Sequence, residues 1–130
     1  MSHLLETVER AYAALNAGDP TPVSELLHPD AEWVPDSRVG ESAIRGRDNV
    51  IGFFMDRAEM FGELQFEVER CWEQGDLVLV FLRVAGSGQA SGAGFEIRIA
   101  HLWTLRDGIA VRGEGFGDRA EALKAAGVEE

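Results

Sequence analysis

The sequence predicts an α+β fold in which helices and strands occupy separate parts of the chain. Apolar residues recur with the helical period as far as Phe61, and with the two-residue period of strands after Gly62. The strand segments follow one another through turns, which favours an antiparallel meander. Helices segregated from such a sheet are typical of the α+β class. The 130 residues fit one domain, covering 1–130.

Two helices are predicted before residue 30. From Leu4 to Ala17 the apolar residues form the stripe of an amphipathic helix, and Gly18 supplies the stop. A second, short helix is capped by Asp19 or Thr21 and has proline in its first turn. It ends at His28-Pro29, because proline cannot continue a helix.

The rest of the chain predicts one more helix, four strands and a closing helix. Gly46 precedes the third helix, roughly Asp48 to Phe61, whose acidic first residue suits the positive helix end. Asp107-Gly108 is the pattern of a two-residue hairpin turn. Asp118 starts the final helix and Gly127 ends it. A short extended piece is expected over 31–35, and strands over 64–73, 76–85, 95–106 and from Ile109 onward.

One ionisable side chain interrupts an apolar strand face. From Phe95 to Arg106 the side chains alternate between a polar and an apolar face, and His101 is the only ionisable group on the apolar one. Burial lowers the pKa of an imidazole, so its surroundings decide whether it is a paired core residue or a proton carrier. The apolar face consists of Phe95, Ile97, Ile99, His101, Trp103 and Leu105.

Charge and composition argue against several function classes. A net charge of −11 and a pI near 4.6 disfavour nucleic acid and anionic membranes as partners. The longest apolar run, 77–82, is too short to cross a bilayer, and the charged N-terminus is unlike a signal peptide, so we expect a cytoplasmic protein. The scattered His3, His28 and His101 show no metal-ligand spacing, and we expect neither metal nor cofactor.

The strand over 76–85, DLVLVFLRVA, is apolar on both faces. This pattern is typical of a central strand, or of one whose outer face meets another subunit. Because one small core cannot cover both faces, we expect a homodimer joined through the outer face of the sheet.

Four motifs carry a resemblance to a known family. AYAALNAGD, HPDAEW, GRDNVIGFF and LWTLRDG occur in order along the chain. Together with the element order, they resemble the nuclear transport factor 2-like superfamily over about residues 4 to 127, most closely its SnoaL-like branch of polyketide cyclases and steroid delta-isomerases. The resemblance implies a cystatin-like, cone-shaped α+β barrel. In it, a strongly curved antiparallel sheet wraps around three N-terminal helices, a short helix follows, and an apolar pocket opens at one end.

The resemblance also implies roles for individual residues. His101 falls where steroid isomerases place an acid that donates a hydrogen bond to the developing oxyanion, which a histidine can also do. The position of their general base is Pro35 here, with Asp36 one residue beyond.

The pairing of the last two strands decides where Glu114 lies. Glu114 faces His101 if the last hairpin is regular, whereas a bulge among the neighbouring glycines turns it to the other face; we favour the bulge.

Two function classes follow. The first is an isomerase, cyclase or dehydratase that acts on a small hydrophobic carbonyl compound by proton transfer, with His101, Asp36 and Glu114 as candidate catalytic residues. The second is a module that binds a hydrophobic metabolite without catalysis. Most aromatic residues are expected to be core, but a subset would line the ligand pocket: Tyr12, Trp33, Phe54, Trp103 and Phe116.

Overall fold

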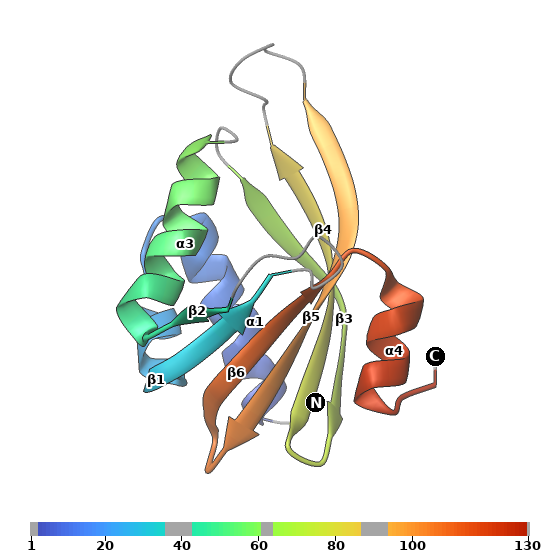
Figure 1. Ribbon diagram of the computed structural model, residues 1–130. Coiled ribbons are helices and arrows are strands. Elements are labelled where there is room, and N and C mark those ends of the chain that lie inside the picture. The colour runs from blue at the N-terminus through green and yellow to red at the C-terminus, as the bar shows by residue number, and fades with distance from the viewer. Residues whose placement is uncertain (1–2, 36–42, 61–63, 87–93, 130) are drawn as a thin grey trace.

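The computed structural model describes residues 3–35, 43–60, 64–86 and 94–129 of the chain. Their helices and strands follow the predicted order, and Figure 1 shows helices on both sides of a curved sheet. The helices are α1 (His3–Asn16), α2 (Thr21–Leu26), α3 (Arg47–Met60) and α4 (Arg119–Ala126). The strands are β1 (Leu27–Val34), β2 (Ile44–Arg45), β3 (Gln65–Gln74), β4 (Leu77–Gly86), β5 (Phe95–Arg106) and β6 (Ile109–Phe116).

The six strands form one open sheet in the order β2-β1-β6-β5-β4-β3. Strands β3 to β6 form the predicted antiparallel meander. Strand β1 pairs with β6 in the parallel sense, so the sheet is mixed and not antiparallel throughout. This pair joins segments far apart in the chain, and periodicity carries no information about such a pairing. The predicted α+β class and cone-like architecture are confirmed.

Two details near β1 differ from the predictions. The strand begins at Leu27, four residues before the expected extended piece, and includes Pro29. The ladder to β6 shifts register between Leu27 and Glu32, so Pro29 lies where its missing N–H removes no regular ladder bond. Strand β2 was not predicted, because its two residues are too few for any alternation to show.

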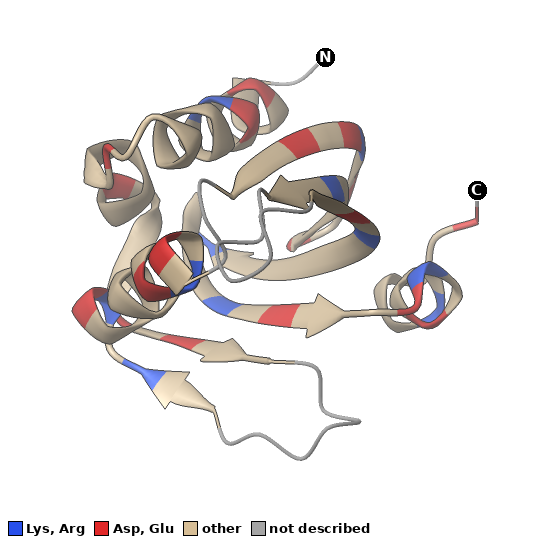
Figure 2. Ribbon diagram, turned by 90° about the horizontal axis from the view of Figure 1, so that it is seen from above, with Lys and Arg blue, Asp and Glu red and all other residues tan. Residues whose placement is uncertain are grey.

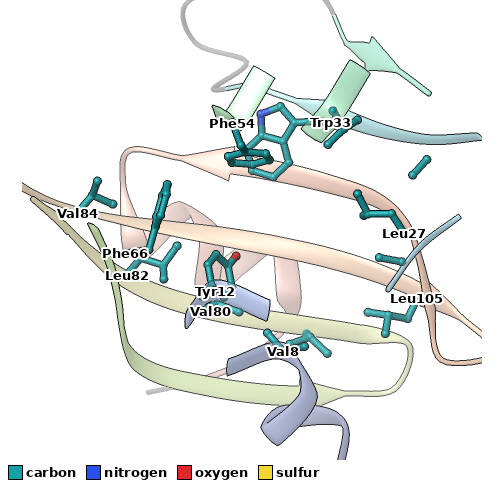
Figure 3. Packing of buried hydrophobic residues seen from close by; sticks show 14 of the residues in the cluster. Val8, Tyr12, Leu27, Trp33, Phe54, Phe66, Val80, Leu82, Val84 and Leu105 are labelled. Atoms are coloured by element: carbon teal, nitrogen blue, oxygen red, sulfur yellow. The ribbon is translucent and has the colours of Figure 1, made fainter. Parts of the chain in front are cut away.

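The two faces of the sheet bury separate apolar clusters. The inner face packs against α1 and α3, and Figure 3 shows Tyr12, Trp33 and Phe54 converging there with strand residues. The outer face of β4 and β5 packs against α4, where Leu79 is 1 % and Phe81 is 3 % exposed. The protein's own last helix therefore covers the apolar surface from which we expected the homodimer, which stays a prediction without that support.

Charged residues are spread over the helices and the strands (Figure 2). On the outer face, several of them form ion pairs between neighbouring strands, as Arg83 does with Glu67 and Glu96. None of the described helices is long and apolar enough to span a membrane.

Candidate functional site

A cavity of about 430 Å³ lies between the inner face of the sheet, the end of β1 and α3. Its described wall is almost wholly apolar, and the polar side chains in it are Trp33, Arg57 and His101. A volume of this size accommodates a small organic ligand. The aromatic residues that line it are Trp33, Phe53, Phe54, Phe66, Phe95 and Phe116.

His101 lies in this wall and is 3 % exposed. Strand alternation on β5 turns its side chain to the inner face, opposite Val80 of β4 and Gly115 of β6. Among the described residues it is the only buried polar or charged one. Burial lowers the pKa of His101 from 6.5 to about 3, so the imidazole is neutral at physiological pH.

One hydrogen bond holds the imidazole, and a second holds its partner Tyr12. Tyr12 Oη lies 2.7 Å from His101 Nδ1, and Trp103 Nε1 donates to the same Tyr12 oxygen at 2.9 Å. An indole nitrogen can only donate, so the Tyr12 oxygen accepts from Trp103 and its own O–H is free to donate to His101. This assignment requires Nδ1 to be an acceptor. In a neutral imidazole the proton then resides on Nε2.

The second imidazole nitrogen has no partner among the described residues. Since His101 lines the cavity, its Nε2–H is available to a ligand oxygen. Burial also raises the pKa of Tyr12, so its hydroxyl stays protonated and keeps its donor role. With Trp103 donating to Tyr12 and Tyr12 donating to His101 Nδ1, the remaining imidazole N–H is on Nε2 of a side chain that lines the cavity.

Tyr12 contacts His101 in a way that the sequence analysis did not predict. It was expected to line the pocket, and no contact with His101 was foreseen. The signal was present in the periodicity, since Tyr12 belongs to the apolar stripe of α1 and His101 to the apolar face of β5. Both faces turn toward one core, where the two rings lie with centroids 5.8 Å apart.

Aromatic rings surround the imidazole on its other sides. Trp33 crosses it edge-on, with centroids 4.8 Å apart and planes at 76°, and Phe54 and Phe66 lie at 5.9 and 6.2 Å. Trp33, Phe54 and Phe116 line the cavity, as expected. Trp103 lies instead beside a second cavity of about 60 Å³, which Tyr12, Phe54 and apolar residues of α1 and α2 also enclose.

The structure separates Glu114 from His101. The ladder between β5 and β6 shifts register between Thr104 and Leu105. A bulge is therefore present, but it lies at Val111 and not among the glycines that suggested it, of which Gly113 and Gly115 pair regularly. His101 then faces Gly115, and Glu114 faces Leu102 on the outer side. Its carboxylate lies 3.4 Å from Arg112, so the alternative carboxylate–histidine dyad is not formed.

Asp36, the third candidate, lies outside the described residues. It directly follows Pro35, which lines the cavity. Among the described residues no group of three or more His, Cys, Asp or Glu side chains could hold a metal ion.

The model of the SnoaL-like domain family matches residues 8–113. The chain belongs to this SnoaL-like family. The match includes His101 and the aromatic residues packed against it, which are Tyr12, Trp33, Phe54, Phe66 and Trp103.

Solved structures of similar fold cover nearly the whole chain. The structure of TerC with polyporic acid is 25% identical over 95% of this chain and 97% of that chain, with a TM-score of 0.75. A nuclear transport factor 2-like protein from Burkholderia thailandensis is 26% identical, with coverages of 96% and 98% and a TM-score of 0.76. IdmH from Streptomyces antibioticus, a suggested polyketide cyclase, is 24% identical over 98% and 100%, at 0.74. No curated protein matches the sequence.

Proposed function

We propose that this SnoaL-like protein binds a small hydrophobic carbonyl compound in the 430 Å³ cavity and promotes proton transfer on it. The observation that supports this function best is the buried His101 in the cavity wall, whose Nδ1 is bonded to Tyr12 and whose low pKa keeps the ring neutral. With Tyr12 as donor to Nδ1, the imidazole proton is on Nε2 and can be offered to a ligand. A carbonyl oxygen that accepts this hydrogen bond is polarised. A donor placed where charge develops stabilises an enolate more than the ketone, which lowers the barrier to enolisation.

The low pKa of His101 defines its role. A group with a pKa of about 3 is almost never protonated at neutral pH, so it does not act as an imidazolium acid. It acts as a fixed neutral donor, a use of histidine that avoids leaving a strong acid beside the oxyanion. Tyr12 and Trp103 are positioning residues, because they hold the tautomer that directs the N–H toward the ligand.

The reaction also needs a base. A base would take a proton from the carbon next to the carbonyl, the C–H electron pair would form the C=C bond, and the oxygen would become the oxyanion held by His101. In a ketone with a β,γ double bond, return of the proton to the γ carbon completes an isomerisation. In a cyclisation the enolate carbon attacks a second carbonyl carbon, and the alkoxide formed there takes the proton from the base. We propose Asp36 as the base, because it directly follows the cavity residue Pro35.

A second candidate function is binding without catalysis. The described wall of the cavity contains no carboxylate, and Arg57 and His101 are its titratable groups. The ligand would then accept a hydrogen bond from His101 and be released without having reacted. The crystallisation of TerC with polyporic acid is a precedent for a small ligand in a similar protein.

Hydrogen exchange on a simple ketone distinguishes the two functions. The ketone 2-tetralone exchanges its α-protons in D₂O at a rate that NMR follows, and an enolising protein accelerates this exchange. We expect acceleration by the wild type, loss of about a hundredfold or more in His101→Ala, and loss in Asp36→Asn. Glu114→Gln is the matched control, because that carboxylate lies on the outer side and should not matter.

The opposite outcome is equally clear. Saturable binding of 2-tetralone with exchange at the background rate would support the binding module and exclude the enolisation. Equal loss of exchange in Asp36→Asn and Glu114→Gln would contradict the assignment of the base.

A further inference from the structure

Trp33 contains a buried N–H group with no partner among the described residues. The residue is 3 % exposed and lies in the wall of the same cavity as His101. A buried donor left unpaired costs about 1–3 kcal/mol, and most such groups in native proteins are satisfied. A ligand that accepts a hydrogen bond from this N–H would account for a donor in this position.

The indole is held firmly by its neighbours. Phe54 contacts it edge-on at 4.9 Å, and Trp103 lies at 5.3 Å. Both indoles lie over Gly113 of β6, where an added Cβ would be 2.7 Å from Trp33 Cε3 and 2.4 Å from Trp103 Cζ3. Figure 3 shows the Trp33 nitrogen on the edge of the ring turned away from Tyr12 and Leu105, which border the smaller cavity.

Two rings that carry N–H groups are thus adjacent in one wall. The centroids of Trp33 and His101 are 4.8 Å apart. Trp33 Nε1 has no partner among the described residues, and the hydrogen bond of His101 uses Nδ1. The remaining polar side chain of the described wall, Arg57, is also a donor without acceptor capacity. The described polar side chains therefore complement oxygen acceptors and would leave a ligand's own donor groups unpaired.

We propose that Trp33 Nε1–H is a second ligand-binding donor beside His101, and that the ligand has two neighbouring oxygen acceptors. A β-dicarbonyl compound, its enolate or a hydroxyquinone has this pattern. One oxygen accepts from His101 Nε2–H and the other from Trp33 Nε1–H. This inference rests on the proposed function and adds a second polar contact, which restricts the class of ligand and fixes its orientation.

Indole NMR tests the proposal in the wild-type protein. The chain has three tryptophans, so three indole N–H signals are expected. The probe is 2-hydroxy-1,4-naphthoquinone, and naphthalene, which has the same two rings without oxygen, measures the ring-current effect. We expect the Trp33 signal to move downfield with the hydroxyquinone and not with naphthalene. Trp103, already bonded to Tyr12, and Trp72, which packs on Phe81, serve as internal references.

Affinity measurements on two variants complete the test. Trp33→Phe keeps an aromatic ring and removes the N–H, so binding of the hydroxyquinone should weaken by roughly threefold to tenfold, the effect of one neutral hydrogen bond. The affinity of this variant for naphthalene should decrease much less. The matched control Trp72→Phe changes an indole on the other face and should bind both probes as the wild type does.

The outcomes separate this inference from the function on which it rests. Binding of the hydroxyquinone with an unmoved Trp33 signal, or with equal affinity in Trp33→Phe, overturns the role of Trp33 and leaves that of His101 intact. Failure of both probes to bind the wild type contradicts both proposals. If Trp33→Phe does not fold, the Trp33 signal of the wild type decides.

Discussion

The two faces of β5 differ in how their polar groups are paired. On the inner face, His101 and the neighbouring Trp33 each hold an N–H in apolar surroundings without a partner among the described residues. On the outer face, Arg119 of α4 donates to the backbone carbonyls of Leu82 and Ile99 and pairs with Glu69. Arg119 on the outer face is thus paired within the chain, whereas on the inner face Trp33 Nε1 has no partner among the described residues.

This difference distinguishes a face that stabilises the fold from the face that we propose binds the ligand. Helix α4 covers the outer apolar cluster and is fixed by a cap from Asp118 to Ala120 N and by the left-handed Gly127. The inner face is packed less completely and leaves a cavity of about 430 Å³. Substitutions on the outer face should therefore change stability alone, and those around the cavity should change binding as well.

The largest expected effect on stability comes from the outer cluster. Leu79 is 1 % exposed beneath α4, and Leu79→Ala should destabilise the protein by about 2–5 kcal/mol through lost burial and the cavity left behind. Urea unfolding measures this loss. Affinity for 2-tetralone should not change in conditions where the variant is folded. A parallel loss of affinity would mean that the two faces are not independent.

Gly113→Ala should affect both stability and binding. The new Cβ would overlap the rings of Trp33 and Trp103, so we expect a loss of about 1–3 kcal/mol from overpacking. The displaced indoles should also weaken ligand binding, measured by titration calorimetry. A variant as stable as the wild type, with unchanged affinity, would contradict the close packing of the two indoles on β6.

The loss of stability at low pH should reveal that the imidazole of His101 is buried in the folded protein. The pKa of His101 is lowered from 6.5 to about 3, so below pH 6.5 the unfolded chain takes up a proton that the folded one does not. This stabilising contribution is complete above pH 6.5 and falls by about 1.4 kcal/mol per unit as the pH decreases toward 3. The wild type should therefore lose more stability than His101→Leu between pH 6.5 and 5. Parallel pH profiles would contradict the burial.

The smallest effect is expected for an exposed ion pair of the outer face. Arg83 pairs with Glu67 and Glu96 across β3, β4 and β5, but its side chain is 38 % exposed. Solvent and salt screen such pairs, so Arg83→Ala should change the melting temperature only slightly and leave binding intact. A large loss of stability would show that this cluster contributes as much as the apolar contacts beneath α4.

Periodicity predicted the fold and part of the site. The stripe of α1 and the alternation of β5 placed Tyr12 and His101 on core faces. A bulge that turns Glu114 away was favoured, although it lies at Val111 and not among the glycines of β6. Local patterns show that a face is apolar but not what covers it. For this reason α4 was overlooked as the cover of β4, and a second subunit was expected instead.

The hydrogen bonds of the site could not be predicted from the sequence. The bond between Tyr12 and His101 joins residues 89 positions apart, and its formation depends on how α1 rests on the sheet. The same holds for the parallel pairing of β1 with β6, which brings Trp33 beside Gly113. Such distant contacts follow from the packing of whole elements, which no local window of residues contains.

The protonation state of His101 is the most direct test of the account. Nitrogen-15 NMR of the imidazole distinguishes the two neutral tautomers and the charged form across a pH titration. We expect the Nε2–H tautomer from pH 8 down to about pH 4, and a change of tautomer preference in Tyr12→Phe, which removes the donor to Nδ1. A wild-type imidazole that titrates near 6.5, or that holds its proton on Nδ1, would contradict the proposal that a neutral N–H faces the ligand.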